Sequence, residues 1–201
     1  MSGNVAAILL AAGRSRRMGS CKQLLPLGKA TVIDRCLTTL QQGGIGDIVV
    51  VVSESGQQIA AAARKHDVRV VVNRVDDGDM ASSVRAGRDA LDAGTSGIVV
   101  ALSDCPLVSP ETVSLLVHLH DIFPDGIITP AHEGRRGHPL LFARTILDEL
   151  AEEMTLRDVV QSDLHRIYEV PVDDIGILMD MDTPDDYVRL AGILDQSTGV
   201  R

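Results

Sequence analysis

Short runs of apolar, often β-branched residues alternate with amphipathic segments along the first two thirds of the chain. The apolar runs predict buried strands at 5–10, 47–52, 68–72, 97–102 and 127–129. The segments between them have apolar residues at helical spacing and predict helices at 31–42, 57–65, 82–93 and 110–120. A regular alternation of strands and helices is typical of α/β proteins, so we expect three α-β-α layers around a doubly wound, mostly parallel sheet.

The last third of the chain is less regular. Residues 134–142 fit either a loop or one arm of a hairpin. Two helices and a strand are predicted at 144–153, 156–161 and 167–170. A final helix is expected to begin at Thr183 and Pro184, since proline is favoured at the first helical position, and to run to about residue 194. No internal repeat, low-complexity tract or linker interrupts the sequence, so residues 1–201 are expected to form a single domain.

Composition narrows the possible partners and the compartment. The chain has 19 Lys and Arg against 28 Asp and Glu, and its net charge of −9 disfavours general binding to nucleic acid or to an anionic membrane. Its three cysteines lack C-x-x-C spacing, which indicates a reducing compartment without a disulfide framework. No signal-peptide pattern precedes the first strand, and no apolar stretch approaches ~20 residues. We therefore expect a cytoplasmic protein with neither nucleic acid nor membrane as a partner.

The most informative segment is the loop after the first strand, LAAGRSRRMGSCK at 10–22. Glycines let backbone N–H groups approach a ligand closely, and the surrounding basic side chains favour an anion. A strand that feeds such a loop and then a helix often holds a polyphosphate, so the loop predicts a nucleoside triphosphate site. Its spacing matches neither the P-loop pattern nor Gly-x-Gly-x-x-Gly, and the alternative interpretation is a solvated basic loop.

Two more polar clusters follow predicted strands, at 73–80 and 103–107. In an open α/β sheet, ligands bind beyond the carboxyl ends of the strands, so these clusters and the basic loop are expected to form one site. Asp104 follows a wholly apolar strand and is a candidate ligand for Mg²⁺, a cation that prefers oxygen ligands. The alternative role for Asp104 is to cap the turn before Pro106.

A second group of carboxylates, in the segment DMDTPDD at 180–186, lies at the start of the final predicted helix. Capping by Thr183 and interaction with the helix dipole explain the last two aspartates. Capping does not explain Asp180 and Asp182, which precede it. Either of these two could supply a second metal ligand.

Histidines and cysteines give weaker signals. His138 lies in a basic, glycine-containing turn and could contact an anionic acceptor or cap the turn. His118 and His120 lie two positions apart on a predicted helix and are expected at the surface. No Ser-His-Asp spacing or Gly-x-Ser-x-Gly elbow occurs, which argues against a hydrolase. Cys21 and Cys105 are interpreted as incidental small residues that border the site.

Together these segments resemble the MobA-like nucleotidyltransferases, and most closely the molybdenum cofactor cytidylyltransferases. The matching motifs are LAAGRSRRMG and KQLLPL within 10–27, GDMASSVRAG at 78–87, SDCPLV at 103–108, GHPLLF at 137–142 and DMDTPDD at 180–186. The resemblance runs nearly end to end and implies the Rossmann-like nucleotidyltransferase fold. One departure is at 153–160, where cytidylyl members often carry Gly-Asp-x-Gly-Ala-Arg and where Arg157 is a candidate replacement.

The resemblance also implies a reaction and the residues that perform it. The reaction is transfer of CMP from CTP to the terminal phosphate of molybdopterin, with release of pyrophosphate. Lys22, Arg17 and Asp104 would be the catalytic residues, and Asp104 and Asp182 would hold Mg²⁺. The residues expected to bind the nucleotide are Leu10, Ala11, Ala12, Gly13, Arg14, Ser15, Lys22, Ser82, Ser83, Arg85 and His138.

The sequence says less about the identity of the nucleotide base and of the acceptor than about the type of reaction. Guanylyl relatives typically carry Ala-Gly-Gly where this chain has Ala-Ala-Gly at 11–13, so CTP is favoured over GTP. One alternative is a guanylyltransferase, or another nucleotidyltransferase with a different phosphate acceptor. A further alternative is a protein that carries the molybdenum cofactor to a molybdenum hydroxylase without catalysing a reaction.

Overall fold

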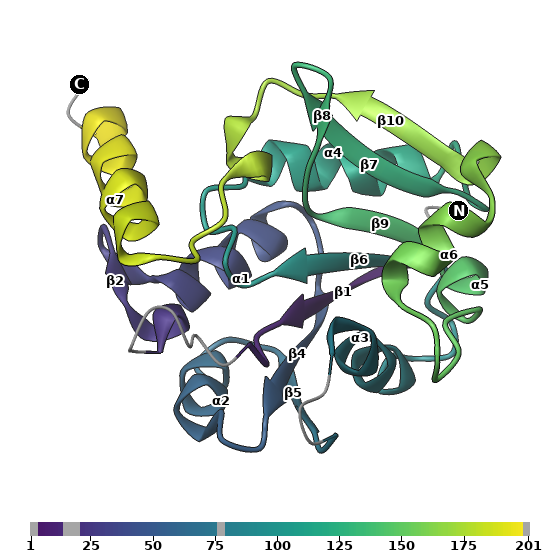
Figure 1. Ribbon diagram of the computed structural model, residues 1–201, viewed down its shortest axis with the longest axis horizontal. Helices are drawn as coiled ribbons and strands as arrows, with labels where there is room; N and C mark the ends of the chain where they lie inside the picture. Colours follow the sequence, from purple (N-terminus) through teal and green to yellow (C-terminus); the bar gives the residue numbers. More distant parts are fainter. Residues whose placement is uncertain (1–3, 14–20, 76–78, 199–201) are drawn as a thin grey trace.

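The computed structural model of the protein describes residues 4–13, 21–75 and 79–198. One mixed sheet runs through its centre, and Figure 1 shows helices on both faces of it. In spatial order the strands are β10 (Ile167–Pro171), β7 (Ile127–His132), β9 (Leu140–Ala143), β6 (Gly97–Leu102), β1 (Val5–Leu10), β4 (Asp47–Ser53) and β5 (Arg69–Asn73), with β8 (Arg135–Arg136) paired to β7. The expected architecture, a mostly parallel sheet between helical layers, is confirmed.

Strands β8 and β9 run antiparallel to the neighbours with which they pair, whereas the other strands of the sheet are parallel. β1 is parallel to β4 and β6, β4 is parallel to β5, and β10 is parallel to β7. β9 lies between β6 and β7 and is antiparallel to both. The hairpin alternative for 134–142 is therefore correct. Glu133 and Gly134 form its two-residue turn, and both have positive φ, which matches the twist of a hairpin.

The sheet is buried on both faces, as the valine run of β4 requires. Val49 and Val51 belong to one apolar cluster, whereas Val50 and Val52 belong to the other, because successive side chains of a strand point to opposite faces. One face is covered by α1 (Val32–Gln42), α2 (Gln57–Ala63) and α4 (Pro110–His120), and the other by α3 (Met80–Asp89), α5 (Arg144–Leu147) and α6 (Leu156–Ser162). No helix in the described residues has the length and apolar character needed to cross a membrane.

A third apolar cluster lies to one side of the sheet. There α7 (Pro184–Thr198) packs beside the small hairpin of β2 (Pro26–Leu27) and β3 (Ala30–Thr31), as Figure 1 shows. The fully buried members of this cluster are Leu27, Val32, Met181 and Leu190. Tyr187 Oη also donates a hydrogen bond to Pro26 O at 2.6 Å. The cluster therefore fastens the start of β2 to the segment that precedes α7.

The helix predicted at 144–153 is wrong in its length, since α5 ends at Leu147. The carbonyl oxygens of Leu147 and Leu150 accept hydrogen bonds from Arg88 Nη1 of α3, at 3.1 and 3.4 Å. A side chain from a neighbouring helix thus satisfies carbonyls that another helical turn would otherwise use. Local periodicity carries no information about this tertiary partner.

The expected surface position of His120 is also wrong. His120 is only 1% exposed, and its Nε2 lies 3.2 Å from Ser96 Oγ. Its ring packs over Gly97, where an added Cβ would come within 2.7 Å of the ring. The imidazole therefore fills space that a residue without a side chain leaves open at the start of β6. His118 is exposed, as expected.

The first turn of α1 contains a carboxylate with a perturbed pKa. Thr31 and Asp34 form a reciprocal capping box, and the second oxygen of Asp34 lies 2.9 Å from His66 Nε2. Burial opposes ionisation of Asp34, but the contacts with Thr31 and His66 outweigh it and hold the pKa of the carboxyl below its ordinary 3.8. Such a group stabilises the fold above its unfolded-state pKa and loses that contribution as the pH falls through its folded-state pKa.

We expect Asp34→Asn to lower the free energy of unfolding by about 1 kcal/mol at neutral pH, since weakening a helix cap costs about that much. The difference in unfolding free energy between the variant and the wild type should stay constant above pH 3.8. Below that pH the difference should shrink, because the wild type loses the negative charge of Asp34 and the variant has none to lose. Urea unfolding at neutral pH and near about pH 3 measures both differences. Equal destabilisation at the two pH values would contradict a role for the Asp34 charge.

Candidate active site

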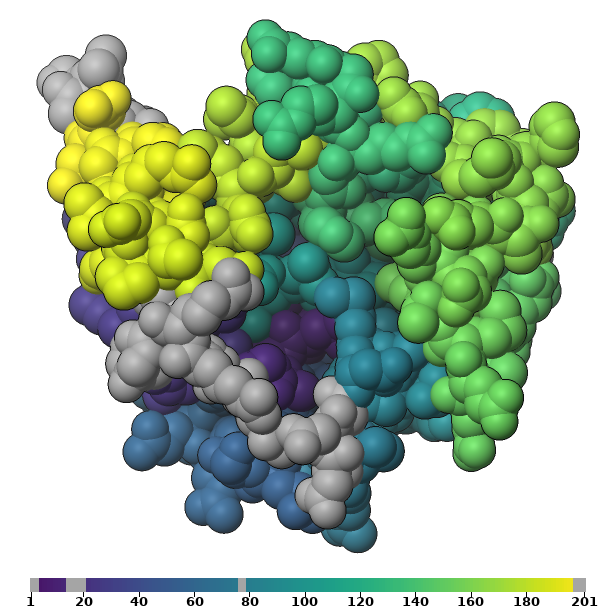
Figure 2. Space-filling view, in the orientation of Figure 1, coloured from purple at the N-terminus to yellow at the C-terminus, as the bar shows by residue number. Residues whose placement is uncertain are grey.

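Three segments that are far apart in the sequence meet at the carboxyl ends of β1 and β6. Leu10 O accepts a hydrogen bond from Ser103 N at 3.1 Å, which joins the segment after β1 to the segment after β6. Met181 N donates to Asp104 O at 2.9 Å, which adds the segment before α7. Figure 2 shows this face of the molecule hollowed at its centre, with N-terminal residues in purple at the bottom of the hollow. This is the edge of an open sheet at which ligands bind.

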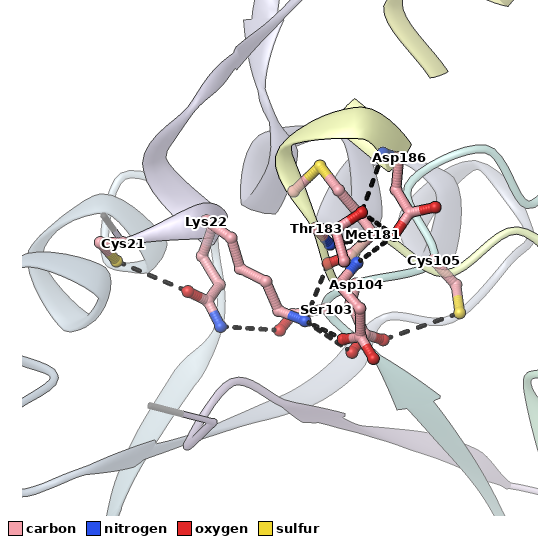
Figure 3. A network of polar contacts seen from close by, with 10 residues as sticks. Cys21, Lys22, Ser103, Asp104, Cys105, Met181, Thr183 and Asp186 are labelled. Atoms are coloured by element: carbon pink, nitrogen blue, oxygen red, sulfur yellow. Dashed lines mark hydrogen bonds and ion pairs between the residues drawn. The ribbon is translucent and has the colours of Figure 1, made fainter. Parts of the chain in front are cut away.

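Lys22 is the central side chain of this site. It begins η1 (Lys22–Leu24), a single 3-10 turn, and only 8% of its side chain is exposed. Its Nζ lies 3.0 Å from Asp104 Oδ2, 3.0 Å from Asp182 Oδ1 and 2.9 Å from Met181 O, as Figure 3 shows for the labelled members. One ammonium group therefore bridges carboxylates that lie 82 and 160 positions later in the chain.

The two carboxylates determine the protonation state of Lys22. Burial alone would lower the pKa of Lys22, but the two carboxylates outweigh burial and raise it above the ordinary 10.5, so the amine is charged at neutral pH. Counted over these three described side chains alone, one positive charge faces two negative charges. Of the two aspartates left open by the sequence, Asp182 contacts Lys22, whereas Asp180 is exposed.

The backbone around Asp182 is held in place by the cap of α7. The Oδ2 atom of Asp186 accepts hydrogen bonds from Asp182 N at 3.2 Å and from Thr183 N at 2.9 Å. Asp186 N in turn donates to Thr183 Oγ1 at 3.2 Å. The capping role expected for Thr183 is confirmed, and Asp186, expected to interact with the helix dipole, also takes part in the cap. The cap also has a second consequence, because it orients the peptide that presents Asp182 to Lys22.

Gln23 is a site residue that sequence reasoning missed. It is only 1% exposed, and its Nε2 donates to Ser103 Oγ at 3.5 Å, beside Asp104. Cys21 Sγ lies 3.5 Å from Gln23 Oε1, so the amide links the start of η1 to the end of β6. Its signals in the sequence were its position next to Lys22 and its place in the KQLLPL motif. A buried amide with partners on two segments stabilises the approach of Lys22 to Asp104.

The buried thiol beside the site is not activated for chemistry. Cys105 Sγ lies 3.7 Å from Asp104 Oδ1, and burial together with the charge of Asp104 raises the pKa of the thiol. A thiol with a raised pKa is protonated at neutral pH and is a poor nucleophile. This agrees with the interpretation of Cys105 as a small residue that borders the site.

Ser82 and Ser83, assigned by resemblance to the nucleoside, lie at the start of α3 and are buried. Asn73 Nδ2 donates to both hydroxyl oxygens, at 2.9 and 3.0 Å. Ser82 Oγ donates to Asp79 O at 2.9 Å, and Ser82 N donates to Asp79 Oδ1, the N-cap of the helix. The structure therefore uses these serines to join the end of β5 to α3, at the carboxyl edge of the sheet.

Arg85 belongs to α3, and His138 lies between β8 and β9. Arg85 Nη1 donates to Ala151 O at 2.9 Å. His138 N donates to Ile177 O at 3.0 Å, and burial lowers the pKa of its ring against the fields of Asp104 and Asp180. The imidazole is therefore neutral at pH 7. Neither side chain directly contacts Lys22 through a described hydrogen bond.

His138 also lines an open groove of about 410 Å³ beside α6. The apolar walls include Ile127, Leu140, Leu156, Val160, Leu164 and Ile167, and the basic lining residues are Arg136 and Arg157. Arg136 is paired with Glu169 at 2.6 Å, and Arg157 is exposed. The groove therefore combines apolar walls with positive charge, which suits a ligand that has an apolar body and an anionic group.

Several residues assigned to the triphosphate by resemblance, namely Arg14, Ser15 and Arg17, lie outside the described residues. Ahead of them, Ala11 is buried and Ala12 is half-buried. Gly13 is exposed, and among the described residues, its chain neighbours aside, no atom lies within 4 Å of the place where its Cβ would be.

The donor set at the site fits a divalent cation only in part. Asp104 and Asp182 offer the hard oxygen ligands that Mg²⁺ prefers. Within the described ranges, no group of three His, Cys, Asp or Glu side chains could hold a metal ion by itself. Two carboxylates completed by waters and substrate phosphates are the usual arrangement for Mg²⁺ in phosphoryl-transfer enzymes.

Comparisons with known proteins identify the family of the chain. A family model described as the MobA-like NTP transferase domain matches residues 7–169. Nicotine blue oxidoreductase of Paenarthrobacter nicotinovorans is 35% identical over 145 residues, which cover 68% of this chain and 70% of that protein. Molybdenum cofactor cytidylyltransferase of Escherichia coli (strain K12) is 27% identical over 185 residues, covering 90% and 92%. Rv0371c of Mycobacterium tuberculosis H37Rv, solved in complex with manganese, has a TM-score of 0.78 and 30% identity over 96% of this chain and 100% of that chain.

Proposed function

Because the chain belongs to the MobA-like NTP transferase family, we propose that it transfers CMP from CTP to the terminal phosphate of molybdopterin and releases pyrophosphate. The observation that carries this proposal is the Lys22 ammonium held between Asp104 and Asp182 at the strand ends. Transfer to a phosphate needs positive charge beside the triphosphate and carboxylates for a divalent cation, and the cluster offers both. The similarity to the cytidylyltransferase of Escherichia coli over most of both chains supports this choice of reaction.

The chemical step needs charge stabilisation more than proton transfer. The acceptor phosphate is already anionic at neutral pH, so its oxygen attacks the α-phosphorus of CTP without a strong general base. One P–O bond forms to the acceptor while the bond to the β-phosphate oxygen breaks, and pyrophosphate leaves. Lys22 offsets the negative charge that develops near the α-phosphate, and backbone N–H groups of 12–15 together with Arg17 hold the β- and γ-phosphates. Positioning and fixed charges therefore supply the rate enhancement.

Asp104 and Asp182 would hold the divalent cation, which we propose is Mg²⁺. When bound, such a cation neutralises charge on the triphosphate and polarises its oxygens. The manganese in the structure of Rv0371c, a relative 30% identical to this chain, supports a divalent metal. The cap formed by Asp186 keeps Asp182 in position for this role.

The preference for CTP rests on position 12. The half-buried Ala12 places a methyl group where the guanylyl relatives that this chain resembles have glycine, which narrows the space available to a base. A pyrimidine needs less room than a purine. We therefore propose CTP as the donor and GTP as a poorer one.

For the acceptor, we propose the groove beside α6. Its apolar walls suit a ring system, and the exposed Arg157 offers a charge for an anionic group. Arg157 lies in the segment where the chain departs from the cytidylyl pattern, and we propose that it replaces the arginine of that pattern. His138 lines the same groove with a neutral ring, and we propose that it contacts the acceptor rather than the triphosphate.

We expect Arg157→Ala to raise the KM for the acceptor by about 10-fold, which corresponds to the loss of one charge-assisted hydrogen bond. The kcat at saturating acceptor and the KM for CTP should change by less than about 2-fold, because the donor site is intact. The matched control is Arg64→Ala, which removes an exposed arginine at the end of α2. An unchanged acceptor KM in Arg157→Ala would contradict this placement of the acceptor.

The proposal is tested with α-labelled nucleotides and Mg²⁺ in the presence of purified molybdopterin. We expect label to appear in the acceptor with CTP and to a smaller extent with GTP. Transfer to a different phosphate acceptor would support the nucleotidyltransferase activity and contradict molybdopterin as the acceptor. Absence of transfer with all four nucleotides, together with cofactor binding that survives Asp104→Asn, would instead favour a carrier for a molybdenum hydroxylase. The 35% identity to an oxidoreductase makes redox activity the next assay in that case.

A further inference from the structure

We propose that Lys22 occupies the cation site between Asp104 and Asp182 while no nucleotide is bound, so that the divalent metal enters the site only together with the triphosphate. This inference rests on the proposed function and adds an order of binding to it. It assigns Lys22 a second role as a positioning residue that keeps the two carboxylates in place for the metal.

The first argument is geometric. Lys22 Nζ contacts one oxygen of Asp104 and one oxygen of Asp182, both at 3.0 Å. Mg²⁺ needs carboxylate oxygens at about 2.0–2.1 Å and accepts little deviation from octahedral geometry. A cation that bound both of these oxygens would take the place of the ammonium group. Lys22 and the metal therefore compete for the same pair of carboxylates.

The second argument concerns burial. Only 8% of the Lys22 side chain is exposed, compared with 26% for Asp104 and 32% for Asp182. A buried ammonium without a counter-ion is strongly unfavourable, so Lys22 stays with the carboxylates until another anion replaces them. Its third contact, with Met181 O at 2.9 Å, adds to this preference.

The third argument is that the protein's own ligands for a metal are too few. No three suitable side chains cluster in the part of the chain that the structure describes. With Lys22 in place, the charge of the pair of carboxylates is also half neutralised, which weakens attraction for a dication. A triphosphate removes both obstacles. It offers Lys22 a new anionic partner, and its oxygens complete the coordination of the metal.

Binding of metal and nucleotide is then coupled, and the coupling is reciprocal. Nucleotide increases the affinity for metal because it draws Lys22 away, and metal increases the affinity for nucleotide by the same factor. The long, flexible stem of lysine permits this exchange without movement of the backbone. Arginine at position 22 would hold both carboxylates in a rigid fork and would release them less readily.

The test measures Mn²⁺ affinity from the EPR signal of free Mn²⁺, with no nucleotide and with a non-reactive CTP analogue. In the wild type, the analogue should tighten Mn²⁺ binding by at least about 10-fold. Lys22→Met should bind Mn²⁺ at least about 10-fold more tightly than the wild type without nucleotide, and the analogue should add little further. The matched control, Lys29→Met, removes an exposed lysine from the β2–β3 turn and should behave as the wild type.

Adding Asp104→Asn to Lys22→Met should abolish the tight Mn²⁺ site, which shows that the metal uses the vacated carboxylates. The inference is overturned if folded Lys22→Met binds Mn²⁺ no more tightly than the wild type. It is also overturned if the analogue leaves wild-type Mn²⁺ affinity unchanged, a measurement that does not depend on the stability of the variant. Coupling without any nucleotidyl transfer would support this role of Lys22 and count against the proposed reaction alone.

Discussion

Asp104→Asn should lower the rate of nucleotidyl transfer from CTP by at least about 100-fold. The substitution keeps the shape of the side chain but removes the charge that faces Lys22 Nζ at 3.0 Å. It therefore weakens the position of Lys22 and deletes one of the two proposed metal ligands. Initial rates with α-labelled CTP at saturating Mg²⁺ measure the effect, and Asp182→Asn should give a loss of similar size.

Asp180→Asn is the matched control for these two substitutions. Asp180 lies two residues before Asp182 in the same segment, but it is exposed and has no described contact with Lys22. Its rate should stay within about 3-fold of the wild type. If Asp180→Asn loses as much activity as Asp104→Asn, the assignment of the second carboxylate is wrong.

The largest effect on stability is expected for Phe142→Ala, at about 3–5 kcal/mol of unfolding free energy. Phe142 is fully buried in β9, where it is aligned with Ile98 of β6 and Ile127 of β7. Removing the ring leaves a cavity that β9 cannot close, because the strand is hydrogen-bonded on both sides. Urea unfolding at neutral pH measures the loss.

Val188→Ala provides the corresponding surface control, because Val188 on α7 is 68% exposed. Its free energy of unfolding should lie within about 0.5 kcal/mol of the wild type. A loss below about 1.5 kcal/mol for Phe142→Ala would mean that β9 is not part of the central core.

Local sequence features predict much of this fold. A strand buried on both faces is an uninterrupted apolar run, such as the valines of β4. Helices begin at recognisable capping residues, such as Thr155 and Thr183. The position of Asp104 could be inferred for the same reason. A polar residue that follows an apolar strand must lie at the carboxyl edge of a parallel sheet.

Features that depend on distant partners could not be predicted in this way. The bridge from Lys22 to Asp182 joins residues 160 positions apart, and no local pattern distinguishes Asp182 from Asp180. The premature end of α5 depends on Arg88, and the burial of His120 depends on the missing side chain of Gly97. In each case the deciding contact comes from another element of the fold.

The apolar cluster between α7 and the β2–β3 hairpin links the site to the C-terminal helix. Lys22 lies just before β2, and Asp182 lies just before α7. Their ion pair and the burial of Met181 and Leu190 therefore hold the same two segments together. A ligand that separates Lys22 from Asp182 would remove this ion pair and leave the apolar contacts and the hydrogen bond from Tyr187 to Pro26. We therefore expect local unfolding of α7 to become easier when the site is occupied.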